Sequence, residues 1–202
     1  MYIENQVVVI SRQFGSGGRK IGKTLSDRLH IPYYDMALIE MASKRSEADY
    51  ASLLEVDEKK IHRKWYEFSM EVGREYQMKR IPMNEELFDL QAEIIKDLVK
   101  QSPCIIIGRG ADYILRNNKR LLSVFIHADM AVKVEVVCRH YNLSQEEALA
   151  LIRKTDKQRS VYYNYYTDYK WGEVNNYDIA LDRGKLGIEK CVDILEMLYQ
   201  TL

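Results

Sequence analysis

One stretch near the N-terminus carries most of the information on architecture: Val7-Val8-Val9-Ile10-Ser11-Arg12-Gln13-Phe14-Gly15-Ser16-Gly17-Gly18-Arg19-Lys20-Ile21-Gly22. Its first part is apolar and β-branched, which predicts a buried strand. Ile21, Leu25 and Leu29 follow at helical spacing, so a helix comes after the glycines. Glycines let backbone N–H groups converge, and a helix N-terminus adds positive partial charge. The stretch therefore predicts a cradle for phosphate groups.

The same stretch allows two frames for the loop. Residues 17–24 match the Walker A pattern literally. That frame would begin the helix only at Lys23, although Ile21 and Leu25 already belong to its apolar stripe. We therefore place the start of the helix near Gly18, which then occupies the usual position of the lysine.

In this second frame the cradle is a short run of glycine, serine and basic residues, and a basic side chain of the first helical turn supplies the missing cation. The residues expected to hold donor phosphates are Gly15, Ser16, Gly17, Gly18, Arg19 and Lys20. A glycine-rich strand–helix turn without a ligand is the alternative interpretation.

Composition narrows the class of protein. The 202 residues carry 30 basic and 30 acidic side chains, and this zero net charge argues against a nucleic-acid partner. No apolar run is long enough to cross a bilayer, and the first residues lack the core of a signal peptide. Cys104, Cys138 and Cys191 lack metal-ligand spacing, so we expect reduced core cysteines of a cytoplasmic protein.

Strand and helix patterns alternate along the chain, which predicts an α/β fold whose parallel sheet is covered on both faces. Strands are expected at about residues 6–11, 31–35, 104–107, 121–126 and 177–181, and helices at about 18–30, 130–141, 145–166 and 187–200. We expect one domain over residues 1–202, with a helical insertion at about 45–95 and a lid at about 150–172. The apolar side of the insertion is also consistent with a surface through which two copies of the chain form a homodimer.

Polar residues at the ends of the strands are the first candidates for chemistry, because such sheets bind ligands at the carboxyl ends of their strands. Asp35 follows the second strand and either binds a ligand or caps the next helix. Arg109 stands between two glycines after the third strand, where it can grip a phosphate. Ser16 and Asp35 are the candidate ligands of Mg²⁺.

The predicted lid carries a cluster of cations. Asp156 lies three residues from both Arg153 and Arg159, so these side chains share one helical face. The acid can orient the arginines toward a polyphosphate. The tyrosine-rich segment 162–169 follows directly, and we expect most of its rings to pack the lid rather than to stack on a base.

Together these features resemble cytidylate kinase, and more closely the bacterial cytidylate kinase-like proteins. The resemblance rests on the Phe-Gly-Ser-Gly-Gly-Arg loop, the Tyr-Tyr-Asn-Tyr-Tyr-Thr segment of the lid, and Gly108-Arg109. It covers most of the chain and is weakest over residues 45–95. It implies a three-layer P-loop kinase-like fold, with donor phosphates on residues 15–20, the acceptor phosphate on Arg109, and lid and acceptor contacts from Asp156 and Arg159.

The sequence therefore predicts a phosphotransferase that uses ATP and Mg²⁺ and acts on a small acceptor, with a nucleoside monophosphate such as CMP first. The residues expected to act in catalysis are Arg19, Asp35, Arg109 and Arg159, while Arg153 and Asp156 join the loop in binding ATP. A kinase for a non-nucleotide molecule is one alternative. Another is a nucleotide-binding module without turnover, which Gly18 at the lysine position favours. The third alternative is a structural protein that dimerises. Arg109, Asp156 and Arg159 argue against it, because a scaffold needs none of these polar side chains.

Overall fold

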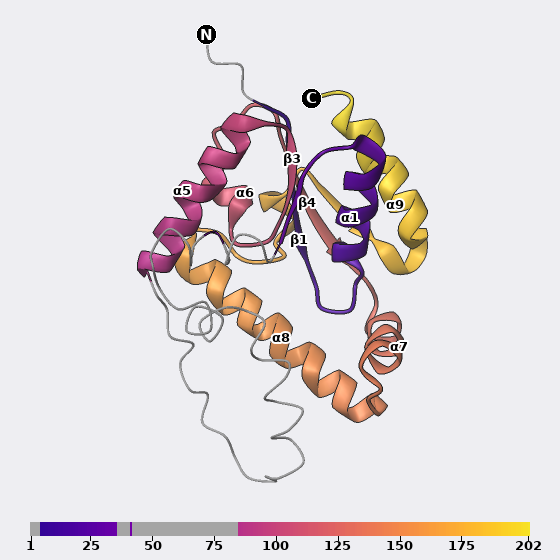
Figure 1. Cartoon of the computed structure of the whole chain (residues 1–202). Coiled ribbons are helices and arrows are strands. Elements are labelled where there is room, and N and C mark those ends of the chain that lie inside the picture. Colours follow the sequence, from indigo (N-terminus) through magenta and orange to yellow (C-terminus); the bar gives the residue numbers. More distant parts are fainter. Residues whose placement is uncertain (1–4, 36–40, 42–84) are drawn as a thin grey trace.

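The computed structural model describes residues 5–35, 41 and 85–202. Its centre is a parallel sheet with the strand order β2-β3-β1-β4-β5 (Figure 1). The strands are β1 (Val7–Arg12), β2 (Tyr33–Tyr34), β3 (Cys104–Ile107), β4 (Leu121–His127) and β5 (Ile179–Asp182). The apolar runs of β1 and β3 are fully buried, as expected for central strands that are covered on both faces.

Helices cover both faces of this sheet, as predicted. On one face lie α1 (Gly18–Leu29) and α9 (Arg183–Tyr199), which pack on Val8 and Ile10 of β1. On the other lie α5 (Glu85–Gln101) and the short α6 (Ala111–Ile114), which pack on Val7 and Val9. Figure 1 shows the sheet between these two layers. Alternate residues of one strand thus face the two halves of the core.

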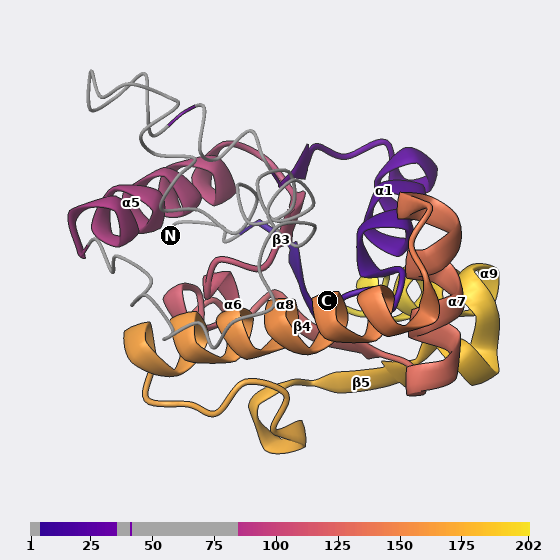
Figure 2. The same ribbon diagram turned by 90° about the horizontal axis from the view of Figure 1, so that it is seen from below.

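Two further helices lie along the carboxyl ends of the strands. They are α7 (Met130–Tyr141) and α8 (Gln145–Tyr166), and Figure 2 shows α8 crossing that edge of the molecule. Ser144 and Glu147 form a capping box at the start of α8, with both reciprocal hydrogen bonds present. Phe14 of the glycine loop is buried against Val137 of α7 and Ile152 of α8. Both helices therefore pack directly on the loop.

The C-terminal part differs from the prediction in its boundaries. β5 begins two residues later than expected, because Asp178 turns its carboxylate to the amide and hydroxyl of Ser123 instead of extending the strand. The last helix begins earlier, at Arg183, because Asp182 accepts hydrogen bonds from the amides of Gly184 and Lys185. Gly187 kinks it at φ 76°. A 3₁₀ turn, η1 (Val174–Asn176), precedes β5.

Residues 85–95 of the predicted insertion lie in α5, whose apolar side faces the sheet core. Residues 45–84 of that insertion lie outside the described residues. The three cysteines are free, with Cys104 and Cys191 buried and Cys138 partly exposed. Within the described parts of the chain, none of the helices combines the length and hydrophobicity that a membrane span needs.

Candidate active site

The glycine loop adopts the frame that the apolar stripe of α1 predicts. Gly17 is the N-cap of α1 with φ 85°, and the helix begins at Gly18. Gly15 also has a positive φ, of 79°, which suits glycine because it lacks a Cβ. Lys23 points away from the loop and pairs with Asp27 at 2.6 Å between Nζ and Oδ1, with both side chains exposed. The literal Walker frame is therefore wrong.

A cavity of about 510 Å³ opens over this loop. Its lining includes six Lys and Arg side chains, which come from β1, α1, α7, α8 and α9: Arg12, Arg19, Lys20, Arg139, Arg159 and Arg183. None of the described residues that line it is an Asp or a Glu. Such a cavity favours a polyanion, since the helix N-terminus and the side chains carry the same sign of charge.

Sequence reasoning did not identify Arg12, Arg139 or Arg183 as parts of this site. Arg139 and Arg183 belong to helices that are far from the glycine loop in the sequence, so no local sequence pattern indicates their role. Arg12 is different, because it stands in the first position of the Walker pattern once Gly18 is assigned to the lysine position. The correct frame of the loop was the signal that could have found it.

The second candidate turn follows β3. Gly108, Arg109 and Gly110 all have positive φ, of 68°, 64° and 65°. This conformation is costly for the arginine and is typical of functional sites. Arg109 is 3% exposed, and burial, together with the charge of Arg12, lowers the pKa of its guanidinium to about 10. The guanidinium therefore remains charged at neutral pH, and little water is present to screen that charge.

Asp35, which follows β2, pairs with Arg19 in the first turn of α1. Its Oδ2 lies 2.8 Å from Nε of Arg19, and its Oδ1 lies 3.4 Å from Nη2 of the same residue. The charge of Asp35 also acts to raise the pKa of Arg109, against the larger effect of burial. Since β1 and β3 are neighbours with Ile10 opposite Ile107, the loop, Asp35 and Arg109 border one edge of the sheet.

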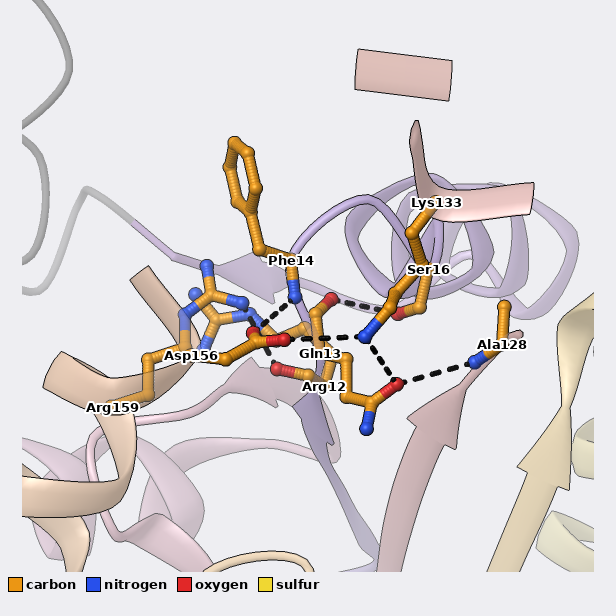
Figure 3. A network of polar contacts seen from close by, with 8 residues as sticks. All are labelled: Arg12, Gln13, Phe14, Ser16, Ala128, Lys133, Asp156 and Arg159. Atoms are coloured by element: carbon orange, nitrogen blue, oxygen red, sulfur yellow. Dashed lines mark hydrogen bonds and ion pairs between the residues drawn. The ribbon is translucent and has the colours of Figure 1, made fainter. Parts of the chain in front are cut away.

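Asp156 of α8 holds the loop by its backbone. Its Oδ1 accepts the amide of Phe14 at 2.6 Å, and its Oδ2 lies 3.3 Å from Nζ of Lys133 (Figure 3). Lys133 is 4% exposed and also donates to Oε1 of Gln13 at 3.1 Å. Burial raises the pKa of Asp156, although the Phe14 amide and Lys133 oppose this shift. Neither Asp156 nor Lys133 is among the residues that line the cavity.

Of the two arginines predicted on α8, the structure brings one to the loop. Arg159 is buried and donates from Nη1 to the carbonyl oxygen of Arg12 at 2.9 Å. Its guanidinium also lies 5.7 Å from the centre of the Phe14 ring, and it lines the cavity. Arg153 is exposed and does not line it. The expected Arg153–Asp156–Arg159 face is therefore divided between solvent, the back of the loop and the cavity.

The two side chains predicted to bind Mg²⁺, Ser16 and Asp35, both have partners within the protein. The hydroxyl of Ser16 is fully buried and donates to the carbonyl oxygen of Gln13 at 2.8 Å. Asp35 is paired with Arg19. In the described ranges no group of three or more His, Cys, Asp or Glu side chains could hold a metal. The role of Ser16 and Asp35 as ligands of Mg²⁺ stays a prediction.

Comparisons with known proteins agree with this geometry. The model of the cytidylate kinase-like family matches residues 7–185. A protein from Eubacterium ventriosum, whose crystal structure is described as that of an uncharacterized protein, is 24% identical, with a TM-score of 0.72 over 98% of this chain and 100% of that one. The comparison with curated proteins gave no match.

Two shikimate kinases share the fold at lower identity. The enzyme from Bacteroides thetaiotaomicron is 14% identical, with a TM-score of 0.51 over 96% of this chain and 98% of that one. The enzyme from Acinetobacter baumannii, solved in complex with shikimate, is 12% identical, with a TM-score of 0.51 over 98% and 94% of the two chains. At these identities the likeness shows a P-loop kinase fold.

Proposed function

The chain belongs to the cytidylate kinase-like family, and from this premise we propose that it transfers the γ-phosphoryl group of ATP to a small acceptor, with CMP as the first candidate. One observation carries the proposal. A glycine loop at the N-terminus of α1 lies under a cavity lined by six cationic side chains and, among its described lining residues, by no carboxylate. Phosphoryl transfer requires mainly positioning and charge neutralisation, which this arrangement offers.

In this proposal the two turns bind the two substrates. Backbone amides of residues 15–18 hold the donor phosphates, and Arg19 and Arg159 neutralise their charge. Arg109 binds an anionic group of the acceptor. With CMP, an ionised phosphate oxygen of the acceptor attacks the γ-phosphorus, the bond from that phosphorus to the β,γ-bridging oxygen breaks, and ADP leaves with that oxygen. Asp35 orients Arg19, the residue with which it pairs.

Arg109 also defines the acceptor class. A buried guanidinium with two planar pairs of donors fits the phosphate of a nucleoside monophosphate. The same group fits a carboxylate equally well, so a small non-nucleotide acid is the second candidate acceptor. Both candidates require the acceptor to be an anion.

The test is an acceptor panel. Purified protein with ATP and Mg²⁺ is offered each nucleoside monophosphate and a set of small hydroxy acids, and release of ADP is coupled to NADH oxidation. We expect turnover with one anionic acceptor and little ATP hydrolysis without it. An active neutral acceptor would contradict the role of Arg109. Saturable ATP binding without turnover across the panel would favour the nucleotide-binding module.

A further inference from the structure

The loop departs from the Walker pattern at two positions, Arg12 and Gly18. The Walker pattern places a glycine five residues before its second glycine, and a lysine directly after that second glycine. With Gly17 as the second glycine, these two positions are Arg12 and Gly18. The chain thus carries a cationic side chain where the pattern has glycine, and glycine where the pattern has the cation.

The two positions are in contact, which links the two changes. A Cβ added to Gly18 would lie 2.6 Å from Cβ and 3.1 Å from Cγ of Arg12. Gly18 is the first residue of α1 and does not need a positive φ, so space and not backbone conformation requires glycine there. With the backbone as it stands, a side chain at one of the two positions excludes a side chain at the other.

The head of Arg12 lies against a second glycine. Nη1 of Arg12 lies against Gly108, at the place where a Cβ would collide with it. The arginine therefore runs from the start of α1, at its stem, to the turn that carries Arg109, at its guanidinium. It lines the cavity over the loop although it is only 4% exposed. Its carbonyl group is fixed by Arg159, as Figure 3 shows.

We infer that Arg12 is the phosphate-binding cation of this loop and takes the place of the lysine that the pattern lacks. The inference rests on the proposed function, because it assumes that the cavity holds the phosphates of ATP. The guanidinium reaches Gly108 in the turn that carries Arg109, and under the proposed function this turn binds the acceptor of the transferred group. Of the three basic residues at the loop, Arg12 is buried, whereas Arg19 is partly exposed and Lys20 is exposed.

The first measurement is calorimetry with ATP and with tripolyphosphate, which reports on the phosphates alone. Arg12→Met keeps the unbranched stem but removes the charge, and it should weaken both ligands about 10- to 150-fold, the loss of one strong charge-assisted contact. Lys23→Met removes an exposed cation from α1 and should change neither affinity more than twofold. Arg12→Lys keeps the charge without the fork, and its affinity should fall between those of Arg12→Met and wild type.

The second measurement compares the ATP affinity of variants in which the residues at positions 12 and 18 are exchanged. Gly18→Lys alone should weaken ATP binding, because its Cβ meets Arg12. The double variant Arg12→Gly/Gly18→Lys rebuilds the usual loop and should regain affinity relative to Gly18→Lys. Thermal melts of each variant separate loss of binding from loss of fold. If Arg12→Met and wild type bind tripolyphosphate equally, the inference is wrong.

Failure of the proposed function has a different signature. If wild type shows no saturable binding of either ligand, both the nucleotide site and the role of Arg12 are excluded. If wild type binds ATP and Arg12→Met does not, but no acceptor is phosphorylated, the role of Arg12 stands and phosphoryl transfer fails.

Discussion

Two turns of this molecule have the same local design and different chemistry. One follows β1 and ends in Gly17, and the other follows the neighbouring β3 and ends in Gly110. Each of these glycines is the N-cap of a helix and has a positive φ, of 85° and 65°. The first turn begins α1, of 12 residues, while the second begins α6, of four. The first can bind anions through amides at a true helix N-terminus, whereas the second depends on the buried side chain of Arg109.

The two turns are also anchored to the same helix by opposite arrangements. At the first, α8 supplies the acid, because Asp156 accepts the amide of Phe14. At the second, the short helix α6 that the turn begins supplies the acid, since Asp112 accepts the hydroxyl of Tyr163 at 2.5 Å. A shift of α8 would therefore act on both turns together, as the proposed lid over donor and acceptor requires.

Arg109→Met tests the dependence of the second turn on one side chain. We expect kcat/KM for the acceptor to fall about 10²- to 10³-fold, as when a single transition-state donor is removed. ATP affinity, measured by calorimetry, should change much less. The same substitution at exposed Arg116, which follows α6, is the control and should leave both quantities near wild type. An equal loss of ATP affinity would show that the two turns are not separate sites.

Asp156→Ala tests how firmly the first turn depends on α8. The change leaves Lys133 buried without its carboxylate and the Phe14 amide without an acceptor. We expect the free energy of unfolding to drop by about 3 kcal/mol, the lower end for a broken buried pair, because Asp156 is partly exposed. Urea denaturation gives this value.

Glu135→Ala is its matched control, because Glu135 pairs with Arg139 at 2.6 Å on an exposed helical surface. There we expect a change within about 0.5 kcal/mol. Equal effects of Asp156→Ala and Glu135→Ala would mean that Asp156 does not anchor the loop.

The sequence predicted the conformation of the first turn better than the side chains that hold the turn in place. The apolar stripe of Ile21 and Leu25 placed the start of α1 correctly, since it depends on residues close together in the chain. The roles of Asp156 and Lys133 could not be predicted, because helical spacing places Asp156 on a face but does not say which backbone group that face meets. From sequence, Gly18→Lys looks like a simple restoration of the usual loop. The 2.6 Å approach of its Cβ to Arg12 appears only in three dimensions.

Arg19→Ala probes the charge of the first turn with a smaller expected effect. We expect ATP affinity to fall by about 1–2 kcal/mol, because a charged contact is lost and Asp35 is left near the phosphates. Lys23→Ala should change it by less than about 0.5 kcal/mol, as for an ordinary surface residue. Calorimetry on both variants measures the difference. A severe loss with Lys23→Ala and none with Arg19→Ala would contradict the frame that the structure shows.

Asp112→Asn examines the anchor of the second turn through its pH dependence. Burial raises the pKa of Asp112, although the hydrogen bond from Tyr163 opposes the shift. The folded state then binds more protons than the unfolded state, so this group's contribution to stability falls as pH rises from the unfolded pKa near 4 through the raised folded value. Asparagine keeps an oxygen for Tyr163 and does not titrate. We therefore expect the free energy of unfolding of the variant, minus that of wild type, to increase as the pH is raised from 4 to 7.5. Urea denaturation at each pH gives both values. Asp168→Asn is measured beside Asp112→Asn as the same substitution at an exposed carboxylate that also accepts a tyrosine hydroxyl, that of Tyr113 at 2.8 Å. A flat profile for Asp112→Asn would mean that the second turn carries no buried charge at this position.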